Sequence, residues 1–212
     1  MALVGLLLIS YLIGAIPTGI LFGKLYRVNI RNKGSGNMGA TNVWRILGWK
    51  AGVPVLLIDL AKGILAAIVI ARLPLGPIPL DPEVVAVLCG TAAVLGHVFP
   101  VYVGFRGGKG VATGAGMLVA VVTVPVAIAI GIFLLALIAR GQVSVGSILG
   151  AISVPVSTVL LNRYSSLHYH PLVIGLTAAL AVFIIITHRS NIIRILRGEE
   201  SRFARWQIWK RH

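Results

Sequence analysis

Long runs of apolar residues alternate along the chain with short connections rich in glycine and in cations. A helix needs roughly 20 residues to cross about 30 Å of hydrocarbon. Six runs come close to that length or exceed it, namely residues 2–22, 51–71, 84–103, 111–139, 143–161 and 171–187. The pattern therefore predicts an all-α protein, a polytopic membrane helix bundle.

The fourth run, residues 111–139, is too long for one straight crossing. As a single helix it would extend about 43 Å, because the rise is about 1.5 Å per residue. Pro125 stands near its middle, where it removes a backbone donor and disfavours helix at Val124. We expect two short helices of about 14 residues each, and therefore seven transmembrane helices in all. The alternative has five spans, keeps this run as one helix and demotes another run.

The cations indicate the orientation of these helices. They cluster in the first and third connections and in the tail, and positive residues favour the cytoplasmic side of a membrane. Only an odd number of crossings places every cluster on that side, with the N-terminus outside and the C-terminus in the cytoplasm. The clusters contain Lys24, Arg27, Arg31, Lys33, Arg45 and Lys50, then Arg106 and Lys109, and finally Arg189, Arg194, Arg197, Arg202, Arg205, Lys210 and Arg211.

Composition supports a membrane protein and disfavours other classes. Of the 212 residues, 58% are hydrophobic and 11% are charged, whereas about a quarter of the residues in a soluble domain are charged. The net charge of +14 lies in short clusters between apolar runs, so we expect no nucleic-acid partner. The single cysteine, Cys89, leaves no internal disulfide and no cysteine-rich metal site. We expect no metal and no cofactor.

No composition shift marks a boundary between domains. We expect a single membrane-embedded domain over residues 1–212, in which residues 198–212 form a basic aromatic tail at the lipid interface. No cation precedes the first apolar run. A cleaved secretory signal has the opposite polarity, so we expect this run to remain as a span.

The first connection is rich in glycine over residues 34–42. Gly34, Gly36 and Gly39 formally match a dinucleotide-binding pattern, with Asp59 20 residues further on. We reject that interpretation because the pattern needs a βαβ unit, whereas this loop joins two spans. Small residues let backbone N–H groups approach an anion, which favours a phosphate loop over a flexible linker. Side-chain groups would be added by Ser35, Asn37, Thr41 and Asn42.

The third connection repeats this arrangement of cations and glycines. It is not a Walker A loop, because Val103 stands where the first glycine should be and Gly110 stands where a serine or threonine should bind Mg²⁺. Lys109 precedes a predicted helix start, where it would add a full charge to a site that already favours phosphate. The alternative is that Lys109 serves membrane topology alone.

Further polar residues stand where helices should meet the cytoplasm. His188, Asn191 and Arg194 recur every three residues and would share a helix face. His188 has a side chain suited to proton exchange near neutrality, or it holds a loop by hydrogen bonding. Ser144 and Ser147 begin a span, where each would contact a phosphate or cap the helix.

Two polar features inside the spans favour structural roles. Asp59 and Lys62 stand three positions apart on one helix, so they can neutralise each other. His97 lies in an apolar segment before the lysine loop, and intramembrane polar groups need partners. We expect His97 to pack and to bond loop backbone.

The motifs in this order resemble those of the bacterial acyl-phosphate-dependent glycerol-3-phosphate acyltransferases. The resemblance rests on residues 34–42, on residues 96–100 followed by 107–113, on residues 187–192, and on residues 59–63. It implies transfer of a fatty acyl group from acyl phosphate to the 1-hydroxyl of glycerol 3-phosphate, giving lysophosphatidic acid. The implied location is the cytoplasmic face of the bacterial inner membrane, among membrane lipids. The tail after Glu200 has no place in the family pattern.

The resemblance also implies roles for individual residues. Lys109 and Arg45 would bind phosphates, Ser35 and Thr41 would surround the acyl phosphate, and Asn191 and His188 would lie near glycerol 3-phosphate. We take four residues as catalytic, namely Ser35, Lys109, His188 and Asn191. The expected substrate contacts are Gly36, Asn37, Gly39, Thr41, Asn42, Arg45, Gly107, Gly108, Ser144 and Ser147.

The chemistry of these substrates needs no covalent enzyme intermediate. Acyl phosphate already carries a good leaving group, so the protein need only align two anions and stabilise the developing oxyanion. The proton would go to His188 or to a substrate phosphate oxygen. The histidine–aspartate motif of soluble acyltransferases is absent, since Tyr102 and Ile193 follow His97 and His188 at the aspartate position. An organic-anion transporter and a noncatalytic scaffold are the alternative functions.

Overall fold

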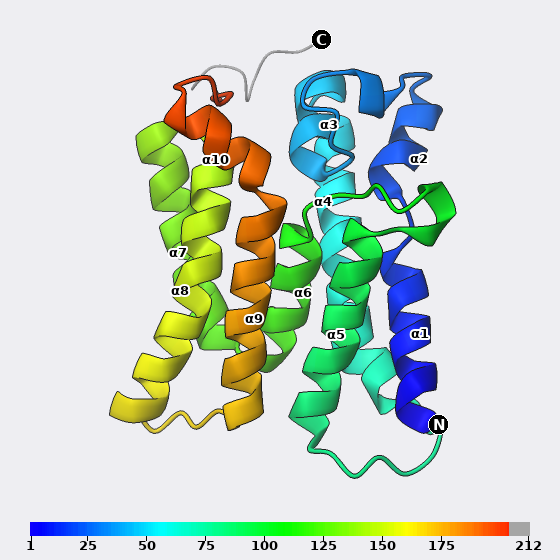
Figure 1. Cartoon of the computed structure of the whole chain (residues 1–212), viewed down its shortest axis with the longest axis vertical. Coiled ribbons are helices and arrows are strands. Elements are labelled where there is room, and N and C mark those ends of the chain that lie inside the picture. Colours follow the sequence, from blue (N-terminus) through cyan, green and yellow to red (C-terminus); the bar gives the residue numbers. More distant parts are fainter. Residues whose placement is uncertain (204–212) are drawn as a thin grey trace. The chain divides into compact units, whose positions relative to one another are not determined.

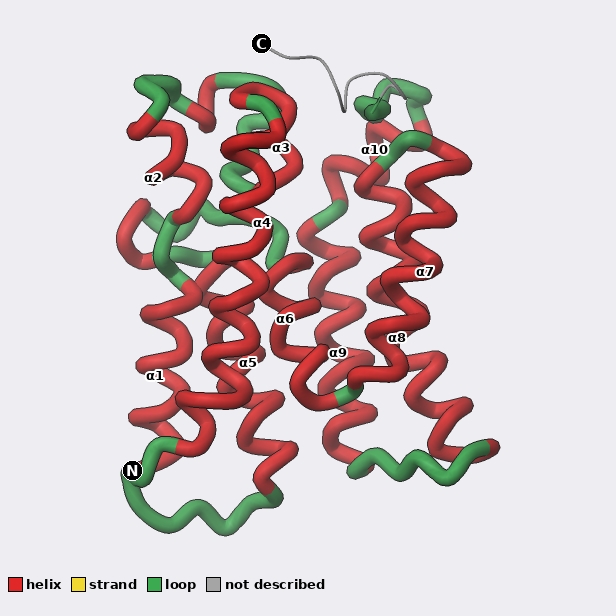
Figure 2. Tube along the Cα trace, turned by 180° about the vertical axis from the view of Figure 1, so that it is seen from behind, coloured by secondary structure: helices red, strands yellow, loops and turns green. Residues whose placement is uncertain are grey.

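The computed structural model describes residues 1–203. Every regular element in this part of the chain is helical, as the apolar pattern predicts. The helices form two compact units, residues 1–121 and residues 122–203, which Figures 1 and 2 show from opposite sides. Most of the predicted tail, residues 204–212, lies outside the described residues.

In the first unit, the long helices pack closely in pairs. α1 packs along α5, and α4 packs along α6. Glycine permits the second contact, because a Cβ at Gly63 would lie 2.0 Å from the carbonyl oxygen of Thr113. The elements of this unit are α1 (Ala2–Gly14), α2 (Thr18–Leu25), η1 (Ile30–Asn32), α3 (Ala40–Leu47), α4 (Trp49–Ile64), η2 (Leu65–Val69), η3 (Ile70–Arg72), α5 (Pro82–Val98), η4 (Val101–Val103) and α6 (Val111–Val121).

The second unit contains three long helices and a short one. α7 (Thr123–Arg140) packs on α8 (Val143–Tyr164), and α8 packs on α9 (Pro171–Thr187). The chain then bends by 59° into α10 (Arg189–Leu196). Within this unit, α10 lies at the end where α7 meets α8, and the connection from α8 to α9 lies at the other end (Figure 1).

The fourth apolar run is divided into two helices, as predicted, and the alternative of one continuous helix is wrong. α6 ends at Val121 and α7 begins at Thr123. The expected lengths of about 14 residues each are also wrong, because α6 has 11 residues and α7 has 18. Pro125 falls in the first turn of α7, where its missing N–H leaves no intrahelical bond unmade. The break therefore precedes the proline.

Five segments of the described chain are long and apolar enough to cross a membrane: Ala2–Leu25, Trp49–Arg72, Pro82–Val103, Thr123–Arg140 and Val143–Tyr164. The bent pair Pro171–Thr187 and Arg189–Leu196 adds a sixth candidate, and Val111–Val121 is a shorter apolar helix. The protein is therefore built as a multi-pass membrane protein.

Candidate active site

We call residues 29–39 the serine loop, because they carry Ser35 between α2 and α3. Asn42, in the first turn of α3, organises this loop from a buried position. Its Nδ2 donates to the carbonyl oxygens of Asn37 at 2.8 Å and Lys33 at 3.2 Å, and its Oδ1 accepts from the backbone N–H of Ser35 at 2.9 Å. The Asn42 side chain thus bonds backbone groups of this irregular loop that would otherwise be bonded within a helix or a sheet.

Glycine is required at position 34 for two reasons. Its φ is +58°, a left-handed conformation that other residues adopt at a cost. A Cβ there would also lie 2.3 Å from Oδ1 of Asn42. The serine loop therefore closes on Asn42 only with glycine at this position, and Ser35 itself stays exposed.

We call residues 99–110 the lysine loop. Its later part folds back on the end of α5, because the N–H of Gly107 donates to the carbonyl of Val98 at 3.0 Å and that of Gly108 to the carbonyl of His97 at 3.1 Å. A Cβ at Gly108 would lie 2.0 Å from Nε2 of His97. His97 thus packs against the loop, as predicted, and it is the His97 carbonyl that bonds the loop backbone; the loop places the half-buried Lys109 at the start of α6.

The expectation that loop amides lie open to an anion is wrong for five of them. The N–H groups of Gly107 and Gly108 are bonded as described, and that of Ser35 donates to Asn42. The N–H of Gly36 donates to the carbonyl of Lys33 at 3.0 Å, and that of Gly39 donates to Oδ1 of Asn37 at 2.8 Å. The glycines serve close packing and tight turns, so an anion would rely more on side chains than the sequence pattern indicated.

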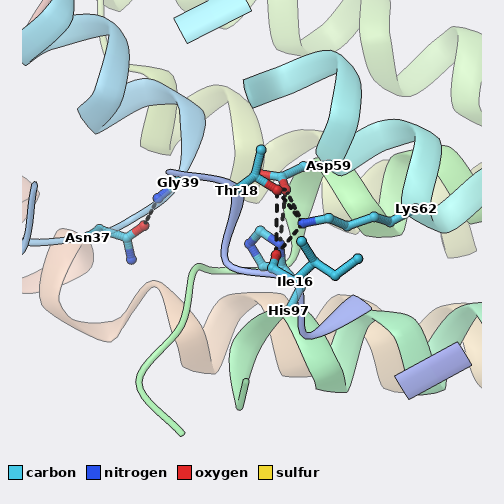
Figure 3. A network of polar contacts seen from close by, with 7 residues as sticks. All are labelled: Ile16, Thr18, Asn37, Gly39, Asp59, Lys62 and His97. Atoms are coloured by element: carbon cyan, nitrogen blue, oxygen red, sulfur yellow. Dashed lines mark hydrogen bonds and ion pairs between the residues drawn. The ribbon is translucent and has the colours of Figure 1, made fainter. Parts of the chain in front are cut away.

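A buried polar network joins side chains of α2, α4 and α5 (Figure 3). Nζ of Lys62 lies 2.7 Å from Oδ1 of Asp59, and it donates to Oγ1 of Thr18 and, at 2.6 Å, to the carbonyl oxygen of Ile16. Three acceptors satisfy the three hydrogens of the ammonium group. The predicted pairing of Asp59 with Lys62 is confirmed.

The same carboxylate faces His97, a contact that the sequence did not indicate. Nδ1 of His97 lies 3.7 Å from Oδ1 of Asp59, which is longer than a hydrogen bond. Oγ1 of Thr18 donates to the same carboxylate oxygen at 2.9 Å. Through His97, the network supports the glycines that precede Lys109.

In the second unit, Glu200 gathers the polar side chains. Its Oε1 accepts from Nδ2 of Asn191 at 2.6 Å, and its Oε2 accepts from Nε of Arg194 at 2.7 Å. Nε2 of Gln142 donates to its carbonyl oxygen at 3.4 Å. Asn191 and Arg194 therefore share a face of α10, as predicted, and that face holds an acid.

Glu200 is ionised by its surroundings although only 8% of its surface is exposed. Burial opposes ionisation, but the hydrogen bond from Asn191, the adjacent Ser144 hydroxyl, and the bond and charge of Arg194 together hold the pKa of Glu200 below its usual value. The cluster therefore carries a fixed negative charge next to Arg194.

His188 stands at the bend between α9 and α10. It is buried, and its Nδ1 lies 2.8 Å from the carbonyl oxygen of Ile184. Ser144 and Ser147 are buried as well, in the first two turns of α8. The second unit thus brings Ser144 together with Asn191 at Glu200.

The remaining predicted residues lie on α3 in the first unit. Thr41 is half-buried in its first turn, and Arg45 is exposed in its last turn. Both residues lie on the helix that directly follows the serine loop.

Comparison with known proteins decides the family. The profile of the family described as glycerol-3-phosphate acyltransferase matches residues 4–198. The chain belongs to this family. A glycerol-3-phosphate acyltransferase of Chlorobium phaeobacteroides is 45% identical over 230 aligned positions, which cover 95% of this chain and 97% of that relative. The acyltransferase of Chlorobaculum tepidum is 45% identical and covers 94% and 95%.

Solved acyltransferase structures are similar over the whole chain. A crystal structure of PlsY, an integral membrane glycerol 3-phosphate acyltransferase, in its glycerol 3-phosphate form has a TM-score of 0.88 and 34% identity and covers 100% of both chains. The lysophosphatidic acid form has a TM-score of 0.85 and covers 98% of both. The family resemblance expected from the motifs is confirmed.

Sequence reasoning missed two residues that the structure makes prominent. Glu200 has a weak signal, as one of only five acidic residues against 19 Lys and Arg, placed eight positions after the motif that contains His188. Arg31, which joins the two loops, has no signal, because its partners are backbone carbonyls more than 70 positions away.

Proposed function

We propose that this protein transfers a fatty acyl group from acyl phosphate to the 1-hydroxyl of glycerol 3-phosphate. The products are lysophosphatidic acid and inorganic phosphate. The observation that carries the proposal is the match of the whole chain to PlsY, whose structures include glycerol 3-phosphate and lysophosphatidic acid forms. Acyl phosphate as the donor follows from the motif resemblance and from the number of cations beside the loops.

The reaction is a direct transfer. The hydroxyl oxygen of glycerol 3-phosphate attacks the carbonyl carbon of acyl phosphate, and the bond from that carbon to the phosphate oxygen breaks. The proton goes to His188 or to a phosphate oxygen of the substrate. Alignment of two anions and neutralisation of their charge supply most of the catalysis.

We assign the phosphate-binding side chains of the first unit to Lys109 and Arg45, with Ser35 and Thr41 as hydroxyl donors. Asn42 is assigned a supporting role, because its amide is used by the serine loop. Gly36, Asn37, Gly39, Gly107 and Gly108 shape the two loops, although they were expected to contact substrate.

In the second unit we assign Asn191 and His188 to glycerol 3-phosphate, with Ser144 and Ser147 nearby. Glu200 takes the Nδ2 group of Asn191. That bond fixes the orientation of the Asn191 amide, which carries both a donor and an acceptor.

We further propose seven transmembrane helices, with the N-terminus outside and the loops and C-terminus in the cytoplasm. The positions of the cations support this orientation. The bacterial inner membrane then supplies the solvent for the acyl chain, and glycerol 3-phosphate reaches the loops from the cytoplasm.

Purified protein in detergent tests the proposed function. We expect lysophosphatidic acid from labelled glycerol 3-phosphate and acyl phosphate, and none when acyl coenzyme A replaces acyl phosphate. Detergent removes the two compartments that transport needs, so product formation would also exclude the transporter alternative. Lack of product with every acyl donor would overturn the proposal.

A further inference from the structure

A single side chain joins the serine loop to the lysine loop. Nη2 of Arg31 donates to the carbonyl oxygen of Val103 at 2.9 Å and to that of Arg106 at 2.7 Å. Both bonds reach from the start of the serine loop to the lysine loop, across 72 and 75 positions of sequence.

The backbone of Arg31 is itself held firmly on the serine-loop side. Ile30, its neighbour, is buried in a core cluster with Val43 and Val55. The N–H of Arg31 donates to Oδ1 of Asn29 at 3.1 Å. The Arg31 backbone is therefore held in place, and the hydrogen bonds from its guanidinium hold the lysine loop relative to the serine loop.

The lysine loop needs such a support because it contains little regular structure. Only the three-residue turn Val101–Val103 is helical between α5 and α6. It is also attached by backbone bonds to the end of α5, at Gly107 and Gly108, and by the Tyr11 hydroxyl, which donates to the carbonyl oxygen of Phe99 at 2.6 Å. Arg31 adds two contacts to the loop, at Val103 and at Arg106, three residues before Lys109.

We propose that Arg31 is a positioning residue for acyl transfer, which sets where Lys109 stands relative to Ser35. The inference rests on the proposed function. Nη2 of Arg31 donates to two carbonyls of the lysine loop, so this side chain acts on the site through that loop. Loss of the bridge should leave the helices packed, because Arg31 is exposed, but should misplace Lys109.

The experiment compares Arg31→Ala with Arg27→Ala in the purified full chain. Arg27 lies in the same connection, is exposed, and carries the same charge, but no side-chain bond in the described part of the chain links it to the lysine loop. A misplacement of about 1 Å can cost about 100-fold in rate. We expect kcat to fall about 10-fold or more for Arg31→Ala and to stay within about 2-fold of wild type for Arg27→Ala. Arg31→Lys should recover part of the loss.

Two readouts separate positioning from a general loss of fold. Hydrogen exchange in residues 99–110 should rise in Arg31→Ala and not in Arg27→Ala, whatever the activity of the protein. The loss of kcat caused by Arg31→Ala should shrink when Lys109 is already alanine, since residues that act through each other are not additive.

The outcomes are distinguishable. If wild type makes lysophosphatidic acid but Arg31→Ala keeps a normal kcat, or lowers it equally in both backgrounds, Arg31 does not position Lys109. Unchanged exchange in residues 99–110 would overturn the bridge itself. Failure of wild type to make product with any donor would instead overturn the proposed function, while the exchange measurement would still decide the bridge.

Discussion

The carboxylate of Asp59 and the ammonium group of Lys62 lie 2.7 Å apart, with only 3% and 4% of the two side chains exposed. Removal of one partner from a buried pair leaves the other charge without compensation, which typically costs about 3–5 kcal/mol. We expect Asp59→Asn to lower the free energy of unfolding by about that amount, measured by thermal unfolding in detergent. The double variant Asp59→Asn, Lys62→Met should regain much of the loss, and an equally unstable double variant would show that the charge of Lys62 is not the cause.

Glu200 should make stability depend on pH. Its pKa in the folded protein is below the ordinary value of 4.5, so its stabilising contribution is complete above that value and is lost as pH falls through the folded pKa. Glu200→Gln should therefore be less stable than wild type at neutral pH, and the difference in Tm should shrink as pH falls below 4.5. Glu199→Gln, at the exposed neighbouring position, is the control and should show no such trend. A difference that stays constant with pH would contradict the assignment.

Lys109 should matter for turnover and little for folding. It is half-buried at a loop end, and loss of one contact to a developing charge commonly costs about 100-fold in kcat. We expect that loss for Lys109→Ala, with a smaller one for Lys109→Arg. Lys24→Ala removes an exposed cation from α2 and serves as the control. Near-normal turnover of Lys109→Ala at saturating substrates would refute the role of Lys109 at phosphate.

Ser35 should not become acylated. His97, the single histidine of residues 1–121, is buried against Gly108 and Asp59 and so is unsuited to activate an exposed serine. Incubation with labelled acyl phosphate alone, followed by denaturation and intact-mass measurement, should show unmodified protein. A stoichiometric adduct that forms as fast as turnover would establish a covalent route.

Cysteine labelling tests the proposed orientation. Arg140 and Arg163 are exposed in the last turns of α7 and α8, so single cysteines at these positions should be labelled from opposite sides. With the buried Cys89 replaced, we expect Arg140→Cys to react only when the cytoplasmic side is accessible and Arg163→Cys to react in intact cells. Labelling of Arg140→Cys from outside would exclude the seven-helix topology.

Much of the architecture follows from local sequence. Apolar run length sets the helices, and Pro125 divides the fourth run, because a proline is better tolerated in the first turn of a helix than in its interior. The pairing of Asp59 with Lys62 also follows from spacing, since residues three apart on a helix are neighbours. The motif order was sufficient to indicate the family. Apart from the motif order, these features depend on residues close in sequence.

The tertiary structure alone decided how the loops are held. Glycine spacing indicated open amides, but the amides of Gly107 and Gly108 donate to the end of α5, and that of Ser35 donates to Asn42. The contact of Asp59 with His97 and the bridge from Arg31 join segments far apart in the chain. Backbone carbonyls are present at every position, so a sequence does not indicate which of them a distant guanidinium will reach; only the packing of α2, α4 and α5 selects the pair.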